Sequence, residues 1–483
     1  MNYKLILQYL GKVLSLLAVL MLLPLLVSLF HSDLMEVWAF FFTSLLLAGV
    51  GLPLGRLQCT TTRLYAKEGF IIVAVSWLAL SLFGALPFYF SGAIPHFMDC
   101  LFESVSGFTT TGASVLQEVE SLSPGILFWR SFTHWIGGMG VLIFLMAIIP
   151  AVAGDRTLHL LKAESPGHAP GKLLPKMHQS SMLLYVIYLV LTLVQFLFLI
   201  AGGMTPFHSI VTAMGTASTG GFSAMNASIA GYNSLYCEIV VTIFMVLCGI
   251  NFNIFYLILI RNVTGALKNE ELRVYFGVLA VAIALITINL TGTVYPTVGQ
   301  SLRYASFQVG SYITTTGYFS ITQMNWPLFS KVILLSLMFI GGCSGSTAGG
   351  LKISRIIITW KEIKRTLFQI IHPRSVEIVK LDGKAVDKGV VQGVCVYSCL
   401  CMFLFFISLL VVSFDNMDIE TTVAAVASCL NNVGAGLGKV GPGGNYAGFS
   451  VLSKGVLAFN MLLGRLELYP LLLLISPRTW RKV

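Results

Sequence analysis

Apolar stretches of membrane-spanning length recur along the chain, with short polar segments between them. A helix that crosses a bilayer needs about 20 predominantly apolar residues. Stretches of this kind lie at 13–30, 37–55, 69–90, 126–150, 182–202, 238–260, 274–291, 389–413 and 455–475. A further one begins near Lys331 and is interrupted after Ile340. This pattern predicts an all-α polytopic membrane protein.

Four polar strings that follow long apolar stretches resemble one another. They are SGFTTTGAS (106–114), GTASTGGFS (215–223), SYITTTGYFS (311–320) and SCLNNVGAGLG (428–438). Aligned on one glycine, they place Gly112, Gly220, Gly317 and Gly434 at equivalent positions. The chain is therefore expected to contain four copies of one structural unit.

Each polar string comes after a short, mixed apolar stretch such as FMDCLFESVSGF (97–108). Such a stretch is too short to cross a bilayer and suits a re-entrant pore helix. Each unit is predicted as helix, re-entrant pore helix and helix, with all four units in one orientation around a central pore. The predicted organisation is an extra N-terminal helix pair (1–67) followed by pore units 1 (68–178), 2 (179–268), 3 (269–380) and 4 (381–483).

The threonines and glycines of the four strings predict an ion-binding ring. Irregular backbone at membrane depth must be buried in protein or line a water-filled path. Glycine can turn its carbonyl toward such a path, where it replaces the water around a dehydrated cation. Tyr318, Phe319 and Phe222 are expected to pack behind these carbonyls. The predicted filter residues are Thr110, Thr111, Gly112, Ser218, Thr219, Gly220, Thr315, Thr316, Gly317, Asn432, Val433 and Gly434. The alternative is that the strings are ordinary external loops.

Five glycines within GGCSGSTAGG (341–350) interrupt the third unit's second helix. Glycine is a poor helix former, so we expect an intramembrane loop beneath the ring that blocks the pore until it moves. The alternative is a tight helix-packing site. Arg465, inside the last apolar stretch, is either an electrostatic barrier that faces the pore or a structural partner of Glu467 or of loop carbonyls. The predicted gating residues are Gly341, Gly342, Gly345, Ser346, Thr347, Gly349, Gly350 and Arg465.

The net charge of +10 has a simple origin in membrane topology. With the N-terminus inside, 24 of the 30 lysines and arginines fall on the inner side, nine of them in 352–388. This asymmetry predicts that both termini are cytoplasmic. It leaves no separate basic face for nucleic acid, so contact with membrane lipid is expected instead. The 352–388 segment is expected to dock a cytoplasmic partner or to touch the inner leaflet.

Two strings have the spacing of nucleotide-binding motifs but lack a residue or a structural context that those motifs need. GSTAGGLK (345–352) has leucine where a phosphate-binding loop needs lysine, and GLGKVG (436–441) opens no βαβ unit. The eight histidines are scattered, without the spacing of a metal site. We therefore predict a protein that is not an enzyme and binds no cofactor itself.

The combined motifs resemble the Trk/Ktr/HKT superfamily, and most closely the TrkH/TrkG-type membrane subunit of bacterial Trk potassium uptake systems. The resemblance rests on TTTGAS, ASTGGFS, TTTGYFS and NNVGAGLG, on GGCSGSTAGGLK (341–352) and on LGRLELYP (463–470). The fourth string departs from the threonine pattern, so a less symmetric ring is expected.

The resemblance implies a function and a set of partners. It implies potassium translocation into the cell, with rubidium tolerated, through a filter gated by the intramembrane loop. It implies a homodimer in the bacterial inner membrane, bound by a cytoplasmic, nucleotide-binding TrkA-like regulatory subunit that alone would carry nucleotide. Glycine at position 112 goes with potassium preference in that family. The alternative is a sodium-permeable or sodium-coupled potassium transporter of the same superfamily.

Overall fold

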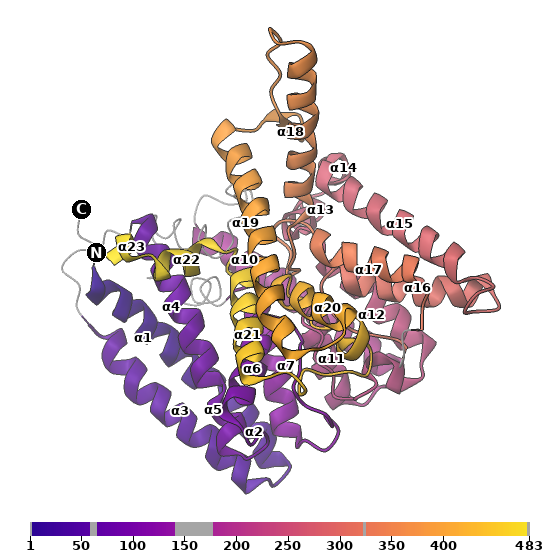
Figure 1. Ribbon diagram of the computed structural model, residues 1–483. Helices are drawn as coiled ribbons and strands as arrows, with labels where there is room; N and C mark the ends of the chain where they lie inside the picture. Colours follow the sequence, from indigo (N-terminus) through magenta and orange to yellow (C-terminus); the bar gives the residue numbers. More distant parts are fainter. Residues whose placement is uncertain (1, 58–64, 141–176, 322–324, 481–483) are drawn as a thin grey trace.

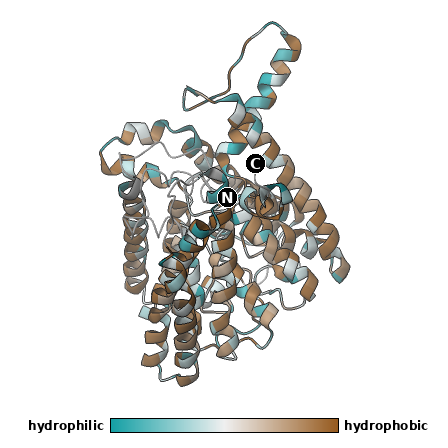
Figure 2. Cartoon of the chain, turned by 90° about the vertical axis from the view of Figure 1, so that its left-hand side faces the viewer, coloured by the Kyte–Doolittle hydropathy of each residue, from teal (hydrophilic) through white to brown (hydrophobic). Residues whose placement is uncertain are grey.

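The described part of the protein is mostly helical. The computed structural model describes residues 2–57, 65–140, 177–321 and 325–480 (Figure 1). Six helices in these ranges are long and apolar enough to cross a membrane, and a bent helix pair adds a seventh candidate. Figure 2 shows these helices side by side and largely covered with hydrophobic residues. The predicted all-α polytopic membrane protein is confirmed.

The N-terminal segment forms a closely packed antiparallel helix pair. Its first arm is α1 (Tyr3–Leu20) with α2 (Leu22–Phe30), and its second arm is α3 (Leu34–Gly55). Glycines let the two arms approach closely, since a Cβ on Gly11 would lie 2.2 Å from the backbone nitrogen of Gly55. Both arms lie to one side of the remaining helices (Figure 1).

The rest of the described chain repeats one order of elements four times: a long helix, a short helix and a second helix. The long helices are α4 (Ala66–Gly84, continued by α5, Leu86–Phe90), α10 (Met177–Ala201), α15 (Glu270–Leu290) and α19 (Lys388–Val412). The short helices are α6 (Phe97–Phe108), α11 (Pro206–Ala217), α16 (Val298–Ile313) and α20 (Ile419–Leu430). The second helices begin as α7 (Pro124–Gly138), α12 (Leu235–Cys248), α17 (Leu328–Ile340) and α21 (Val451–Arg465). Short 3₁₀ turns lie at η2 (Ser228–Tyr232), η3 (Ser413–Asp415) and η4 (Gly438–Val440).

Two spans predicted as continuous helices are broken, which corrects the sequence-based expectation. The 238–260 stretch divides into α12 and α13 (Phe252–Leu259), bent by 92°, because Gly249 ends one helix and the Asn251 side chain caps the next. The 455–475 stretch divides into α21 and α22 (Tyr469–Ile475), where Glu467 and Leu468 both have positive φ. The predicted interruption after Ile340 is confirmed. The later part of the 126–150 stretch lies outside the described residues.

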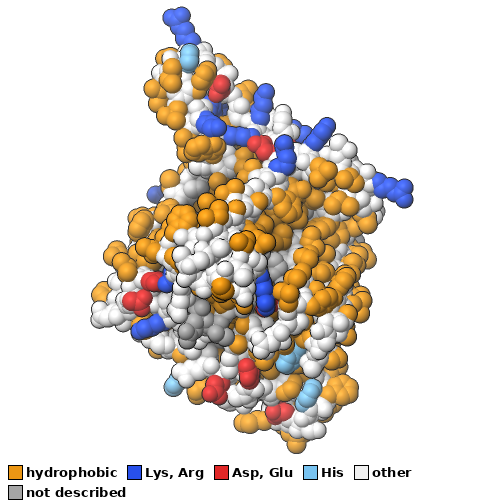
Figure 3. All heavy atoms as spheres, turned by 90° about the vertical axis from the view of Figure 1, so that its right-hand side faces the viewer, with side chains coloured by type: hydrophobic (Ala, Val, Ile, Leu, Met, Phe, Trp, Pro, Cys, Tyr) orange, Lys and Arg blue, Asp and Glu red, His pale blue; other side chains and the backbone are white. Residues whose placement is uncertain are grey.

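A helical hairpin projects from one end of the molecule (Figure 1). It consists of α18 (Ile353–Ile371), the two-stranded ribbon β1 (Lys380–Leu381) and β2 (Lys384–Ala385), and the beginning of α19. Lysine and arginine side chains gather at this end, as Figure 3 shows. The smaller helices α14 (Val263–Lys268) and α23 (Pro477–Trp480) complete the chain.

Candidate functional site

The four short helices end in the same way. In each, a backbone N–H just after the helix donates to the carbonyl oxygen five residues earlier and closes the final turn. An example is the bond from Thr111 N–H to Ser106 O at 3.0 Å. The residue before that N–H is left-handed and is not glycine. These residues are Thr110, Thr219, Thr315 and Asn432, with φ between 53° and 56°. The ends are therefore Schellman motifs that turn the chain sharply after the helix.

This common ending sets the correspondence between the four strings. Two residues beyond the left-handed position, each string has a glycine with positive φ: Gly112, Gly221, Gly317 and Gly434. The alignment predicted from sequence is therefore wrong by one residue in the second string, where Gly221 rather than Gly220 corresponds to Gly112. The corresponding triplet is Thr219, Gly220 and Gly221, and Ser218 caps the helix.

The four strings close into a ring. A Cβ on Gly112 would lie 2.1 Å from the carbonyl oxygen of Gly220, and one on Gly221 would lie 1.9 Å from that of Thr316. The ring continues from Gly317 to the carbonyl oxygen of Val433 and from Gly434 to that of Thr111, both at 2.1 Å. In each contact, the glycine of one string meets the residue that comes directly before the glycine of the next string. The fourth string meets the first in the same way, so the ring is closed. Only glycine permits this approach.

Side chains hold the ring from behind. The hydroxyl of Tyr318 donates to the carbonyl oxygen of Phe222 at 3.1 Å, and that of Tyr446 donates to the carbonyl oxygen of Gly434 at 2.8 Å. Phe222 and Tyr318 are buried, whereas Phe319 is only half-buried. Both phenylalanines also line a pocket on one side of the ring. Hydroxyls pair below the ring, with Thr109 to Thr111 at 2.8 Å.

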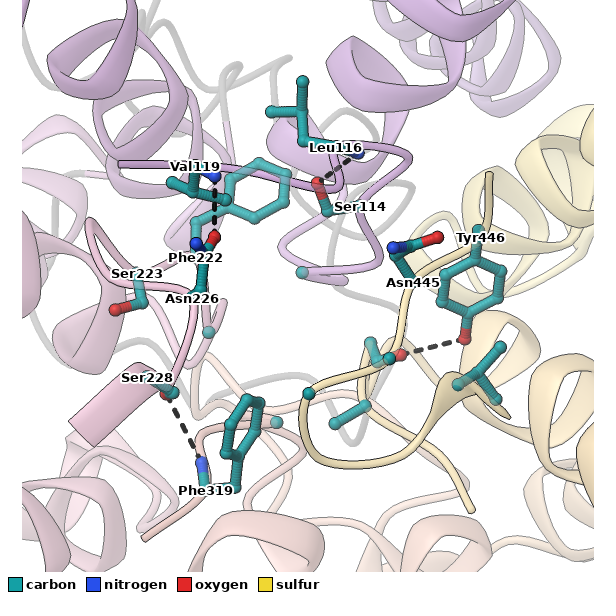
Figure 4. A pocket seen from close by; sticks show the side chains of 18 of the residues that line it. Ser114, Leu116, Val119, Phe222, Ser223, Asn226, Ser228, Phe319, Asn445 and Tyr446 are labelled. Carbon is teal, nitrogen blue, oxygen red and sulfur yellow. Dashed lines mark hydrogen bonds between the residues drawn. The ribbon is translucent and has the colours of Figure 1, made fainter. Parts of the chain in front are cut away.

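A pocket opens on one side of the ring. Its lining includes all four ring glycines, and Figure 4 shows segments from all four units converging around it. The side chains that line it are otherwise neutral except for Arg130. Among the described residues, no acidic side chain lines this pocket.

The glycine-rich segment lies on the opposite side of the ring. We call residues 341–352 the inner loop. The backbone N–H of Gly349 donates to Oγ1 of Thr315 at 2.6 Å, and that of Gly350 donates to the carbonyl oxygen of Asn431 at 3.1 Å. The Thr347 hydroxyl donates to the carbonyl oxygen of Ala217 at 3.1 Å. The inner loop thus contacts the ends of three short helices.

Arg465 fastens the inner loop to the first unit. Its guanidinium donates to the carbonyl oxygen of Thr347 at 2.9 Å and to that of Gly137 at 2.5 Å, and it also bonds Gly138. Of the two roles predicted for Arg465, contact with loop carbonyls is present, and Glu467 pairs with Arg355 instead. Glu271 holds the loop's beginning, because its Oε1 accepts from the Ser344 N–H at 2.6 Å.

Comparison with known proteins identifies the family. Residues 35–482 match the TrkH family, described as a cation transport protein. The chain belongs to the TrkH family. It is 36% identical over 424 residues to the Trk system potassium uptake protein TrkH of Salmonella typhimurium, a match that covers 87% of each chain. It is 34% identical over 490 residues to TrkH of Halomonas elongata, with both chains covered completely.

A solved structure extends this likeness to the whole fold. The crystal structure of the potassium transporter TrkH from Vibrio parahaemolyticus superposes with a TM-score of 0.88 at 32% identity and covers 100% of both chains. The predicted fold, with its four repeated units, agrees with this match. The relatives are named as transport proteins, so the prediction that this TrkH-family chain is not an enzyme also holds.

A buried ion pair supports the first two strings, and sequence reasoning missed it. Arg130 of α7 and Glu103 of α6 are both almost fully buried and meet at 2.8 Å. The carboxylate also accepts from the Val115 N–H at 3.1 Å, and the guanidinium stacks over Phe222 at 4.1 Å. Glu103 therefore has a packing role in this TrkH-family chain and is not among the residues that line the pocket.

A second set of ion pairs joins consecutive units. The fourth residue of α12, Glu238, pairs with Arg303 of α16 at 2.6 Å. The fourth residue of α17, Lys331, pairs with Glu420 of α20. The fourth residue of α21, Lys454, pairs with Asp99 of α6. At the remaining interface this position is Leu127, which packs near Val211 of α11. Alignment of the four second helices, rather than of the polar strings alone, was the signal that could have found these pairs.

Proposed function

We propose that this chain carries potassium into the cell through the ring formed by the four strings. The observation that carries the proposal is a closed ring of carbonyl oxygens at Thr111, Gly220, Thr316 and Val433, each of which lies against the glycine of the preceding string. Carbonyl oxygens in a ring replace the hydration shell of a potassium ion. The relatives named as potassium uptake proteins support the same ion.

The filter assignment follows the register of the structure. The proposed filter residues are Thr110, Thr111, Gly112, Thr219, Gly220, Gly221, Thr315, Thr316, Gly317, Asn432, Val433 and Gly434. The four short helices point their C-terminal ends toward the ring, and the negative end of a helix dipole favours a cation. Rubidium, which resembles potassium in size and charge, is expected to pass as well.

The inner loop is proposed as the gate. Its contacts with Thr315 and Asn431 lie directly below the ring, so an ion that leaves the ring meets the loop. Arg465 holds Thr347 in this position and adds a positive charge beneath the ring. Movement of the loop away from the three short-helix ends would open the path.

The surroundings of the protein are also proposals. We place the protein in the bacterial inner membrane. Both termini and the α18–α19 hairpin are proposed to lie on the cytoplasmic side, because lysine and arginine gather at the end of the molecule that carries the hairpin. The hairpin is the proposed docking surface for a cytoplasmic, nucleotide-binding TrkA-like subunit, and the functional form is proposed to be a homodimer. We propose that the N-terminal helix pair spans 1–67 and that the four pore units span 68–178, 179–268, 269–380 and 381–483.

Uptake of labelled rubidium into liposomes that hold only the purified chain tests the proposal. Uptake that potassium blocks and sodium does not would support a potassium-selective pore. Equal block by sodium would favour the sodium-permeable alternative of the same superfamily. No uptake, both by the full chain and by a folded variant that lacks 345–348, would exclude the pore.

A further inference from the structure

The second string differs from the other three directly before its ring glycine. The other strings have Thr111, Thr316 and Val433 there, and all three side chains are fully buried. The second string has Gly220, which has no side chain. Since protein interiors are closely packed, another group must occupy the corresponding space in this quarter of the ring.

The imidazole ring of His134 occupies that space. A Cβ on Gly220 would lie 1.9 Å from Nδ1 and 2.5 Å from Cγ of His134. The His134 side chain is fully buried and meets the ring of Phe222 edge-on, with centroids 4.1 Å apart. His134 therefore lies against the backbone of Gly220 and the side chain of Phe222, the residues on either side of Gly221.

The second helices differ at the matching position. His134 is the eleventh residue of α7, and the eleventh residues of α12, α17 and α21 are Met245, Met338 and Met461. All four side chains are fully buried. Helix α7 packs against α11, which leads into the second string. The second string, which lacks a side chain at Gly220, thus packs against the only one of these four helices that has a rigid imidazole where the others have a flexible methionine.

Hydrogen bonding does not account for the histidine. Neither ring nitrogen of His134 has a hydrogen-bond partner among the residues that the structure describes. Its contribution is therefore the space that it fills. We infer that His134 is a positioning residue for ion selectivity, an inference that rests on the proposed filter function. The imidazole fills the space of the side chain that Gly220 lacks, and it thereby holds the Gly220 carbonyl in the ring.

Four variants of the full chain in liposomes test this inference: H134M, H134A, G220T and the double variant G220T/H134A. The readout is the ratio of potassium to sodium concentrations that halve labelled rubidium uptake. Methionine fills a similar space without hydrogen bonds, so H134M should keep the selectivity of the parent chain. H134A leaves a void behind the second string, and its selectivity should fall about tenfold, the scale of a packing defect in a recognition site.

The double variant separates space filling from a general structural role. G220T alone should lose most uptake, because its Cβ meets the imidazole. In G220T/H134A the threonine enters the vacated space, so most of the uptake and selectivity should return. Unchanged selectivity in H134A, loss of selectivity in H134M, or a folded double variant no better than G220T would overturn the inference. If the double variant does not fold, H134M against H134A decides.

The proposed function fails separately from this inference. A parent chain that does not discriminate between potassium and sodium would contradict the potassium filter itself. A selective parent chain with an equally selective H134A variant would contradict only the role of His134.

Discussion

Strained threonines bear the sharpest turns of the candidate filter. Thr110, Thr219 and Thr315 are left-handed, a conformation that glycine adopts more easily and that costs other residues about 1–2 kcal/mol. The threonine side chain has a use that glycine lacks, because Oγ1 of Thr315 accepts a hydrogen bond from Gly349 of the inner loop. At Thr315, the left-handed conformation therefore coincides with the contact between ring and loop.

Replacement of Gly221 by alanine tests the ring at the residue scale. Its φ of +84° and the carbonyl oxygen of Thr316, 1.9 Å from a new Cβ, both oppose the change. Gly203 has the same φ but no atom within 4 Å of a new Cβ, so it is a matched control for backbone strain. Gly221→Ala should lower rubidium uptake about tenfold or more, equivalent to at least 1.4 kcal/mol on the barrier. Gly203→Ala should transport normally, and equal effects of the two changes would contradict the ring geometry.

The sequence predicted most of the filter residues but not their register throughout. Three strings carry one glycine after two larger residues, so their alignment is unambiguous. The second string has Gly220 and Gly221 together, and only the helix end at Ala217 decides between them. The role of His134 beside Gly220 could not be predicted from either string, because it comes from a helix about 90 residues earlier.

Removal of four loop residues tests the gate at the element scale. Deletion of residues 345–348 removes the contacts of Thr347 with Ala217 and Arg465. Rubidium flux should rise severalfold, because the segment beneath the ring is shortened. The same deletion combined with Gly221→Ala serves as control, since flux through the ring should then fall again. Unchanged flux in a folded deletion variant would contradict the gate.

Exchange of the Glu238–Arg303 pair tests how consecutive units are held together. Glu238→Arg places two guanidinium groups together, with one position almost buried, and should lower stability by about 2–4 kcal/mol. The double variant Glu238→Arg with Arg303→Glu restores opposite charges and should recover most of the loss. Thermal unfolding of the purified protein measures both. The more exposed Lys331–Glu420 pair should respond less, and additive effects of the two changes would exclude a direct pairing.

Hydropathy predicted the long helices but not the breaks in the second helices of the second and fourth units. The apolar run 238–260 continues through Gly249 and Asn251, and a window average does not register a helix end followed directly by a new cap. The last span is broken at Glu467, where the chain turns so that this carboxylate reaches Arg355. The first break is local but too short for a window average to register, whereas the last coincides with a contact to Arg355, which is distant in the sequence.

At the scale of the whole molecule, four units of a single chain close into one ring, although the contacts between neighbouring units differ. Ion pairs hold three of the unit interfaces, and apolar packing of Leu127 with Val211 holds the first. The pocket collects all four glycines on one side of the ring, and the inner loop contacts the other side. The repeats and their common orientation were predictable from sequence, whereas the partners across each interface were not.

Labelling of single cysteines tests the proposed orientation in the membrane. Glu118, near the pocket, and Lys384, in the hairpin, are both exposed. With the nine native cysteines replaced, Glu118→Cys should react with a membrane-impermeant maleimide in intact cells. Lys384→Cys should react only after the cells are permeabilised. The reverse result would place the hairpin outside the cell and contradict the orientation.

The location of a bound rubidium ion tests the central claim most directly. Anomalous diffraction from crystals of this protein grown with rubidium would locate the ion without reference to transport. The account predicts a peak on the axis of the ring, among the carbonyl oxygens of Thr111, Gly220, Thr316 and Val433, that potassium displaces and sodium does not. A rubidium site elsewhere, with no peak on this axis, would contradict the account.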